Sequence, residues 1–362
     1  MNTSRLYNHF DSAPPTNASK GTMKGFDPEF TDIVDYITRI TYRIWEGKQV
    51  GLCYDYYSED CPIYTLAGMS VGAEVVVQNT IKTLAAFPDR TLHADNVIWG
   101  GNDEDGYHSS HLISTQMTNL GPSEFGPATG KNAIIAVIAH CVVKTNQVIE
   151  EWLVRDNYSL VQQLGLDPVK VAQQWASKPI DPGSDFAKWR DAEIRRVRAT
   201  SNQRGSFNGD AKTDPEGFIR AALQNIWNAR MIGDVSQLYA NNARLQGPSG
   251  RDLTGPEEIR TLYTGVLGAL PDARLSMDYI CSIPYQTSGV DIAVRWTLAG
   301  THNGAALYGE PTGEPILIIG ESHYRIEDNL VIEERTVFDE LSVLTQVYRA
   351  RGVLASTDDT IA

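Results

Sequence analysis

Hydrophobic and polar residues follow two patterns that succeed one another twice along the chain. Over 30–50 and again over 217–233, apolar residues recur at the three- and four-residue spacing of an amphipathic helix. Each helical stretch is followed by runs with β-strand character. These runs cover 92–99, 107–118, 132–143 and 147–154 in the first half, and 274–281, 290–300, 315–326 and 330–337 in the second. Helices first and strands second is an α+β order, so the pattern predicts two α+β domains.

The two halves are related by duplication. Residues 146–163 and 329–346 are identical at nine of eighteen positions and lie 183 residues apart. His140 and His323 match at the same offset. A repeat of this length is a whole domain, not a solenoid unit of about 20–50 residues. The predicted organisation is an N-terminal arm (1–24), domain one (25–166), a partly helical connector and linker (167–213), domain two (214–351) and a C-terminal tail (352–362).

Polar turns at 144–147 and 327–330 predict that the last two strands of each domain form a hairpin. A turn centred on Thr145 and Asn146 places His140 opposite Glu151, and the same arithmetic places His323 opposite Glu334. Opposed residues share a face of the sheet. A carboxylate beside an imidazole orients the ring and raises its pKa, which suits proton transfer. The pattern therefore predicts a His–Glu pair inside each domain.

Strand alternation limits this hypothesis. Trp152 and Asp156 share the parity of Glu150, whereas His140 and Glu151 have the opposite parity. Only one of the two sets can face the interior, unless a β-bulge shifts the register. Two alternatives therefore stay open: a catalytic His140–Glu151 pair in the interior, or a pair on the outer face of the sheet, exposed or at an interface.

The second half carries a more specific pattern. It comprises Gly300-Thr301-His302, Gly304, Pro311-Thr312-Gly313, a strand, Ile332-Glu333 and Asp339. This pattern resembles SnoaL-like polyketide cyclases, the ester-cyclase branch of the nuclear transport factor two-like superfamily. The first half keeps Ile149-Glu150, Trp152 and Asp156 of the same pattern but has Met117-Thr118-Asn119 at the Gly-Thr-His position.

The resemblance implies a fold and a chemistry. The implied fold is two tandem cone-shaped α+β barrels, each a bent antiparallel sheet wrapped on a long N-terminal helix. The implied chemistry is an aldol-type ring closure that needs no metal and no organic cofactor. The aspartate that acts as general acid/base in the cyclases corresponds to Asp156, and its counterpart in the second half is Asp339.

The candidate residues divide into two sets. The predicted catalytic residues are Asp156, His140, Glu151, Asp339 and His323. The predicted substrate-binding residues are Tyr64, Trp99, His111, Trp152, Arg155, Arg295 and Tyr308. For most of the aromatic residues core packing is the simpler interpretation, and for the arginines a salt bridge. No histidine, cysteine or carboxylate cluster has the spacing of a dedicated metal site, so no metal is expected.

Composition narrows the choice of partners. With 31 basic and 45 acidic residues the net charge is −14, which argues against nucleic-acid and anionic-membrane surfaces. We find no signal peptide and no membrane span, and the four cysteines lack a disulfide pattern, so a cytoplasmic location is expected. The expected partner is a small molecule. The duplication predicts an intrachain pseudo-dimer, with a homodimer as the alternative.

Two functions remain from the sequence. The first is a cofactor-independent acid/base enzyme acting on an apolar carbonyl compound by aldol closure, isomerisation or lyase-type elimination. The second is a non-catalytic binding or scaffold protein in which one or both pockets are inactive. The substrate, the reaction and the active domain stay undetermined at this point.

Overall fold

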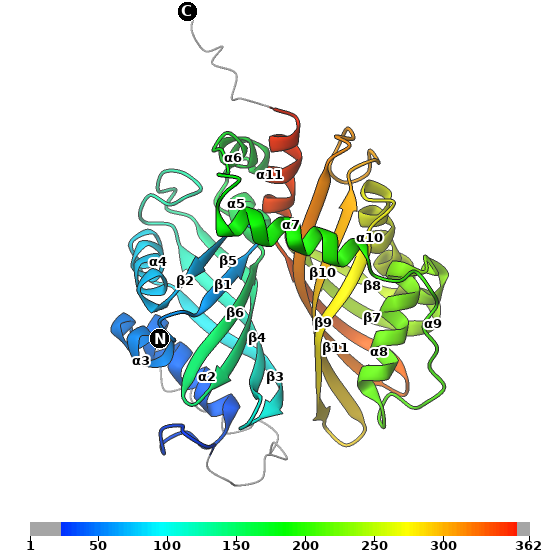
Figure 1. The fold of residues 1–362 in the computed structure, drawn as a ribbon, viewed down its shortest axis with the longest axis horizontal. Helices are drawn as coiled ribbons and strands as arrows, with labels where there is room; N and C mark the ends of the chain where they lie inside the picture. The colour runs from blue at the N-terminus through cyan, green and yellow to red at the C-terminus, as the bar shows by residue number, and fades with distance from the viewer. Residues whose placement is uncertain (1–22, 353–362) are drawn as a thin grey trace, which may run out of the picture.

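The computed structural model describes residues 23–352 and contains two six-stranded sheets (Figure 1). The first sheet consists of β1 (Pro62–Thr65), β2 (Gly68–Val71), β3 (Thr91–Asn102), β4 (Gly106–Thr118), β5 (Asn132–Lys144) and β6 (Gln147–Arg155). The second consists of β7 (Tyr239–Gly247), β8 (Arg251–Thr254), β9 (Arg274–Tyr285), β10 (Gly289–Thr301), β11 (Pro315–Glu327) and β12 (Leu330–Phe338). Their orders, β2-β1-β6-β5-β4-β3 and β8-β7-β12-β11-β10-β9, are equivalent. The predicted α+β class is confirmed.

The sheets are open and mixed, which refines the expectation of antiparallel barrels. β1 runs parallel to β6, and β7 runs parallel to β12, while the other strand pairs are antiparallel. The edge strands β2 and β3 do not pair with each other in the described part of the chain, so the sheet does not close. The parallel pair arises because β1 enters beside the final hairpin strand and runs in its direction. At four residues, β1 is too short to show a clear strand period in the sequence.

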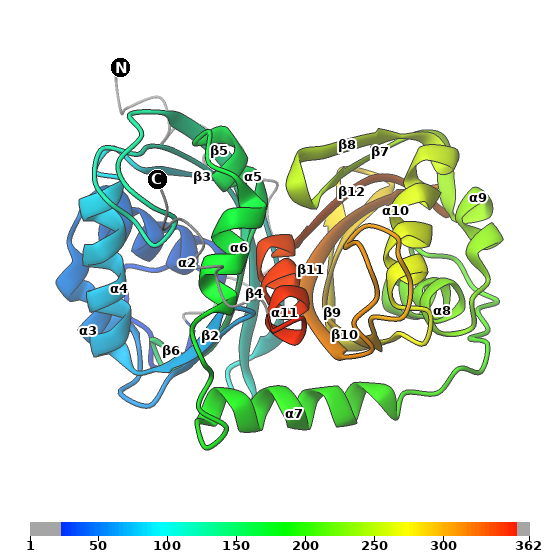
Figure 2. The same cartoon turned by 90° about the horizontal axis from the view of Figure 1, so that it is seen from above.

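Helices cover one face of each sheet. Sheet one carries α2 (Ile33–Thr41), α3 (Cys53–Tyr56) and α4 (Ala73–Ala86), and sheet two carries α8 (Pro215–Leu223), α9 (Val235–Leu238) and α10 (Gly255–Ala269). Figure 2 shows these helices on the far sides of the molecule, with the two sheets facing each other in the middle. Each sheet therefore has an inner face toward its helices and an outer face toward the other domain.

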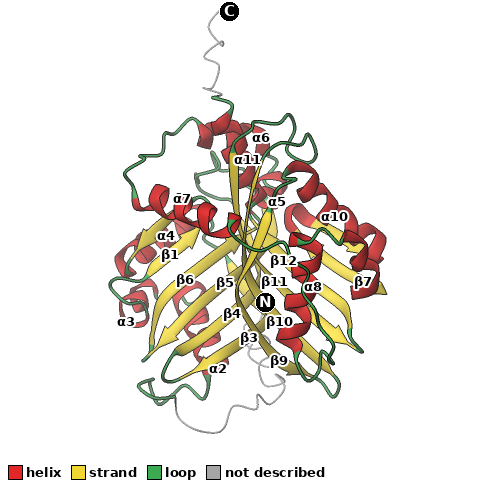
Figure 3. Cartoon of the chain, turned by 45° about the vertical axis from the view of Figure 1, so that its right-hand side comes forward, coloured by secondary structure: helices red, strands yellow, loops and turns green. Residues whose placement is uncertain are grey.

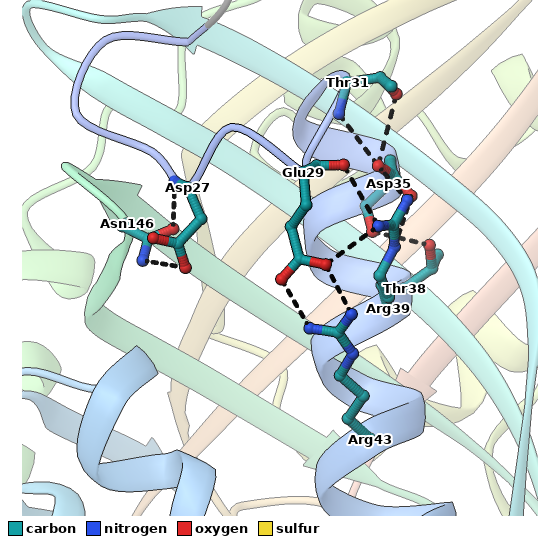
Figure 4. Close-up of polar contacts among 8 residues, drawn as sticks. All are labelled: Asp27, Glu29, Thr31, Asp35, Thr38, Arg39, Arg43 and Asn146. Atoms are coloured by element: carbon teal, nitrogen blue, oxygen red, sulfur yellow. Dashed lines mark hydrogen bonds and ion pairs between the residues drawn. The ribbon is translucent and has the colours of Figure 1, made fainter.

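The first helix is fixed at its start by charged side chains (Figure 4). The Asp32 carboxylate accepts a hydrogen bond from the backbone N–H of Asp35, which caps the helix. Arg39 donates to Asp35 four residues earlier, at 2.7 Å between Nη2 and Oδ2. Arg43 binds Glu29 at 2.7 Å between Nη2 and Oε2. These contacts orient the buried apolar face of α2 onto the sheet.

Helices α2 and α8 are each followed by a π-helical turn, at equivalent places in the two domains. These turns are η1 (Tyr42–Glu46) and η3 (Gln224–Asn228). The N–H of Gly47 reaches the carbonyl of Tyr42 at 2.8 Å, an i→i+5 bond. The wider turn places Trp45 so that its Nε1 donates to the Thr80 hydroxyl at 3.3 Å. π-turns within helices are often found at functional sites.

Four further helices join the two domains. They are α5 (Asn157–Gln163), α6 (Pro168–Ala176), α7 (Asp185–Arg198) and α11 (Glu340–Ala350). Helix α7 crosses from one domain to the other, and α6 packs against α11 (Figures 1 and 3). The segment predicted as a connector thus contains α6 and α7, and both contact the second domain.

Apolar residues on the outer face of sheet one are part of the hydrophobic core of domain two. Leu112, Ile138 and Val154 of sheet one belong to the same buried cluster as the interior of domain two. All three are at most 4% exposed. Burying a side chain of this size stabilises a fold by about 1.5–3 kcal/mol. The two domains therefore share a packed interface within the chain. The predicted arm and tail lie largely outside the described residues.

Candidate active site

A β-bulge decides which residues face the interior of domain one. Thr145 and Asn146 both have positive φ, as a two-residue hairpin turn requires, so the predicted hairpin is confirmed. Between Val143 and Val142 the pairing of β5 with β6 shifts by one residue, which leaves Ile149 without an opposed residue. His140 consequently lies opposite Trp152, not opposite Glu151.

The same bulge occurs in domain two. The register of β11 and β12 shifts between Arg325 and Ile326, so His323 lies opposite Arg335 and Tyr324 lies opposite Glu334. The predicted His140–Glu151 and His323–Glu334 pairs are therefore wrong. Counting from the turn fails because the extra residue moves every later side chain to the other face. The histidines are on the outer faces, and the glutamates are on the inner faces.

Domain one encloses a cavity of about 610 Å³ between its sheet and helix α4. This size falls within the range of ligand pockets. Its polar and charged lining residues, in chain order, are Thr65, Ser70, Asn79, Thr80, Lys82, Thr83, Arg90, Thr115, Ser123, Glu124, Glu151, Arg155, Asn157 and Asp339. Apolar walls come from Ile63, Val76, Ala86, Phe87, Met117, Phe125, Ile135, Val137 and Leu153, and Trp45 and Trp175 also line the cavity. The cavity thus combines an apolar surface with a few charged groups.

Glu151 is a buried carboxylate in the wall of this cavity. It is 6% exposed, and its Oε2 accepts a hydrogen bond from the Tyr57 hydroxyl at 3.1 Å. Burial raises the pKa of Glu151, partly offset by the bond from Tyr57 and by the charge of Arg155. None of the described cations lies within ion-pair distance of this carboxylate. A carboxyl group in such surroundings keeps its proton to a higher pH than an exposed one.

Two arginines lie at the other end of the same wall. Arg155 is four residues beyond Glu151 on β6, on the same face. Arg90 directly precedes β3, and its Nε donates to the Thr115 hydroxyl at 3.2 Å. Burial, together with the nearby charge of Arg155, lowers the pKa of Arg90 to about 9. Among the described residues, neither guanidinium forms an ion pair.

His140 binds the other domain instead of lining the cavity. Its Nδ1 lies 2.8 Å from Oε1 of Glu321, and both side chains are 1% exposed. His323 also contacts the other domain, with its Nε2 2.6 Å from the Ser110 hydroxyl. Burial would raise the pKa of Glu321, but the neighbouring His140 outweighs it and the pKa is lowered. The two predicted catalytic histidines therefore connect the domains.

Three predicted substrate-binding residues also lie between the domains. Tyr64 stacks on Trp152 with ring centroids 5.3 Å apart, and the Arg295 guanidinium lies 3.5 Å from the Trp152 ring centroid. Trp189 of α7 covers the other side of Tyr64 at 5.3 Å. Stacking and cation–π contacts of this kind contribute about 0.5–2 kcal/mol each. None of these side chains lines the cavity.

Asp156 and Asp339 cap helices at equivalent positions. Asp156 caps α5 through the N–H of Ser159 at 3.1 Å. It also accepts hydrogen bonds from the N–H groups of Ser249 at 2.9 Å and Gly250 at 3.1 Å, in domain two. It is therefore an interdomain contact and does not line the cavity, whereas the neighbouring Arg155 and Asn157 do.

Asp339 has a different environment. It accepts from Asn157 Nδ2 at 2.8 Å and from the Ser342 hydroxyl at 2.6 Å, and it lines the cavity of domain one. Burial raises its pKa to about 6, although these hydrogen bonds oppose the rise. Domain two thus contributes one carboxyl group to the wall of the domain-one cavity.

The remaining candidates lie elsewhere in the structure. His111 is 2% exposed, and burial lowers its pKa to about 3. Trp99 packs against Tyr107, and the Tyr308 hydroxyl donates to Glu340 at 3.0 Å. None of the three lines the cavity. Of the predicted site residues, the structure brings Glu151, Arg155 and Asp339 to this cavity.

The corresponding space in domain two is filled, leaving about 20 Å³. Its glutamate, Glu334, accepts hydrogen bonds from the hydroxyls of Tyr239, Tyr263 and Thr336. Several cavity residues of domain one have larger or apolar counterparts 183 residues later. These pairs are Thr80 and Tyr263, Asn79 and Leu262, Thr115 and Leu298, and Arg155 and Phe338. Arg90, Thr80 and Asn79 were not among the candidates from the sequence, although their differences between the two halves are a signal that could have found them.

Residues 23–352 contain neither a metal-binding cluster nor a membrane-spanning helix. Within them, no group of three or more histidine, cysteine or carboxylate side chains is arranged to hold a metal ion. No helix in the same range has the length and hydrophobicity needed to cross a bilayer.

One known family matches the chain. Residues 218–347 match the model of the family described as SnoaL-like polyketide cyclase. The part of the chain that resembles this family is therefore domain two. The strand order of domain one is the same, so the chain contains two copies of one α+β fold in tandem. A comparison with curated proteins finds no match.

Solved structures of single-domain length also match. A candidate SnoaL-like polyketide cyclase from Jannaschia sp. CCS1 is 17% identical, with a TM-score of 0.33, over 40% of this chain and 98% of its own. IdmH, a candidate polyketide cyclase from Streptomyces antibioticus, is 21% identical, with a TM-score of 0.31, over 37% of this chain and 97% of its own. AclR from Streptomyces galilaeus, described as a candidate hydroxylase, is 17% identical, with a TM-score of 0.32, over 40% of this chain and 99% of its own.

Proposed function

We propose that domain one is a cofactor-independent acid/base enzyme that removes a proton from carbon next to a carbonyl group. The observation that carries this proposal is Glu151, a buried carboxylate with a raised pKa in a cavity of about 610 Å³. A general base works best when its pKa lies near the working pH. Burial moves the carboxyl group of Glu151 in that direction.

The roles of the neighbouring groups follow from their contacts. The Tyr57 hydroxyl donates to Oε2 of Glu151, which leaves Oε1 to accept the carbon-bound proton. The Thr80 hydroxyl accepts from Trp45 Nε1, so its own proton can be donated into the cavity. A donor held in this way can stabilise the enolate oxygen that forms as the proton leaves. The enolate then reacts by ring closure, by isomerisation or by elimination.

Domain two has a supporting role in this proposal. Its interior is filled and its glutamate is enclosed by hydroxyl groups, so no substrate has room beside Glu334. It contributes Asp339 and Ile319 to the cavity of domain one. This arrangement favours one active half and one scaffold half over two active halves.

Deuterium exchange into a simple ketone tests the proposal. The protein is incubated in D₂O with 2-tetralone, whose C1 protons are acidic, and deuterium incorporation is followed by NMR. We expect exchange above background for the wild type and for Glu334→Gln, and background exchange for Glu151→Gln. Exchange that survives in Glu151→Gln would contradict the assignment. Binding of the ketone without any exchange would favour a binding protein.

A further inference from the structure

A pocket beside the cavity carries more positive charge than the rest of this acidic chain would suggest. A second cavity of about 290 Å³, here called the vestibule, adjoins the first and shares Leu66, Ala67, Glu124 and Trp175 with it. The vestibule is formed where the loop between α6 and α7 meets α11. Its other charged residues are Lys178, Arg190 and Arg349, so cations outnumber the single carboxylate Glu124.

The arginines of the vestibule are held in place by backbone carbonyls. Arg190 donates to the carbonyl of Pro315 at 3.0 Å, and Arg349 donates to the carbonyl of Trp175 at 3.2 Å. The Nε of Arg349 is buried and has no hydrogen-bond partner within the described chain. A buried donor without an acceptor costs free energy, about 1–3 kcal/mol. Arg349 therefore keeps hydrogen-bonding capacity that the described chain does not use.

The inner cavity also contains two arginines that lack an ion-pair partner. Arg90 and Arg155 lie close enough that the charge of Arg155 disfavours that of Arg90, and neither has a carboxylate within ion-pair distance in the described chain. Domain two has Ala273 and Phe338 at the two equivalent positions. The arginine pair is therefore found in the half that keeps an open cavity, and it is missing from the half that is filled.

We propose that the substrate is an organic anion with an apolar body. It enters through the vestibule, places its acid group on Arg90 and Arg155, and presents its reactive carbon to Glu151. This inference rests on the proposed function and adds the class of substrate to it. Guanidinium groups suit this task because their planar N–H donors match the oxygens of an acid group.

The spacing along β6 sets the size of the molecule. Arg155 and Glu151 are four residues apart, which separates their Cα atoms by roughly 13 Å at about 3.3 Å per residue. Both side chains line the same cavity, so the acid group and the reactive carbon lie at opposite ends of the ligand. A molecule of two or three fused rings spans such a distance and suits a cavity of about 610 Å³.

Two fluorescent probes test the anion site directly. N-phenyl-1-naphthylamine and 8-anilinonaphthalene-1-sulfonate share one apolar body and differ in the sulfonate group. Fluorescence titration at pH 7 gives the affinity for each. We expect the wild type to bind the sulfonate more tightly than the neutral probe. In Arg155→Gln and Arg90→Gln the affinity for the sulfonate should fall roughly tenfold to a hundredfold, while the affinity for the neutral probe stays unchanged.

Control variants separate the possible outcomes. Arg195→Gln removes an exposed charge from α7 and should leave both affinities unchanged. The proposal is overturned if the arginine variants lose affinity for both probes equally, or for neither. It is also overturned if the wild type binds neither probe. Glu151→Gln keeps both arginines and removes a negative charge from the same cavity, so its affinity for the sulfonate should not fall. If the arginine variants bind normally while Glu151→Gln loses deuterium exchange, the anion site fails and the proposed function stands.

Discussion

The two domains have the same fold, but the interior of one contains a cavity and the interior of the other is filled by side chains. Both have the same strand order, the same hairpin turn, the same bulge and a glutamate at the equivalent place on the inner face. In domain one this glutamate lines a cavity of about 610 Å³, and in domain two about 20 Å³ remains. Backbone topology therefore does not decide whether such a fold can hold a ligand. The side chains on the inner faces of the sheet and of one helix decide it.

A few residue differences account for the cavity in one domain and the filled interior of the other. Tyr263 and Leu298 fill the interior of domain two where the smaller Thr80 and Thr115 leave space in domain one. The apolar Phe338 replaces the charged Arg155 of the cavity wall. Filled interiors stabilise a domain through apolar burial and close packing. Domain one gives up part of this stabilisation at its cavity. The shared interface lets domain two support a less densely packed neighbour.

The largest effect is expected from the two equivalent glutamates. Glu151→Gln should lower the rate of proton abstraction by about 10²–10⁴-fold, since it removes the base and keeps its shape. Glu334→Gln should leave the rate unchanged, because no substrate has access to this residue. Initial rates for both variants, with circular dichroism as a control for folding, check the prediction. Equal losses in the two variants would show that the domains do not differ in this way.

The buried pair between the domains should matter for stability. Glu321→Gln removes the negative charge beside His140 and is expected to cost about 1–3 kcal/mol of unfolding free energy at pH 7. Because the pKa of Glu321 is lowered in the folded state, the stabilisation is present above the usual carboxyl range. It is lost as the pH falls through the lowered pKa.

Denaturant titration measures this cost. Glu29→Gln serves as the matched control, since it breaks an exposed ion pair with Arg43 and should cost at most about 1 kcal/mol. If both variants lose the same small amount, His140 and Glu321 do not hold the domains together.

Replacing residues of the domain-one cavity with their counterparts from domain two should fill the cavity. The double variant Thr80→Tyr, Thr115→Leu is expected to weaken binding of the neutral naphthylamine probe about a hundredfold, because the ligand loses its space. The protein should stay folded, since domain two accommodates the same residues. Thr261→Tyr, an exposed change on α10, is the control. Normal binding in the double variant would place the ligand elsewhere.

Asp156 should prove to be a capping residue. Asp156→Ala removes the cap of α5 and two bonds to domain two, which should cost about 1–2 kcal/mol of stability. The rate of deuterium exchange in the folded protein should change less than twofold. A loss comparable to that of Glu151→Gln would instead support the aspartate that the family resemblance implies.

The smallest expected effect is a shift of the pH profile. The base must be ionised, and burial raises the pKa of Glu151, so the rate should fall with decreasing pH at an inflection above 4.5. Tyr57→Phe removes a hydrogen bond that favours the ionised form, so the inflection should move to higher pH. A profile that is unchanged in Tyr57→Phe would show that Glu151 does not control it.

Much of this molecule could be predicted from local sequence patterns. The duplication, the helix-then-strand order, the hairpins and the α+β class all followed from periodicity and from the repeat, because these features depend on near neighbours in the chain. The family pattern around Gly300-Thr301-His302 also identified the domain type, and residues 218–347 match that family. Glu151 and Arg155 were among the candidates, and both line the cavity.

Tertiary structure decided the rest. A single extra residue at Ile149 changed which side of the sheet His140 occupies, and an insertion of that kind leaves no clear mark in the sequence. The partner of His140 is 181 residues away, in the other domain. Whether Asp156 faces a cavity or caps a helix against its neighbour depends on how two sheets pack, which local periodicity does not encode. The sequence determined the elements and their repetition, and packing between the domains determined which side chains are left to meet a ligand.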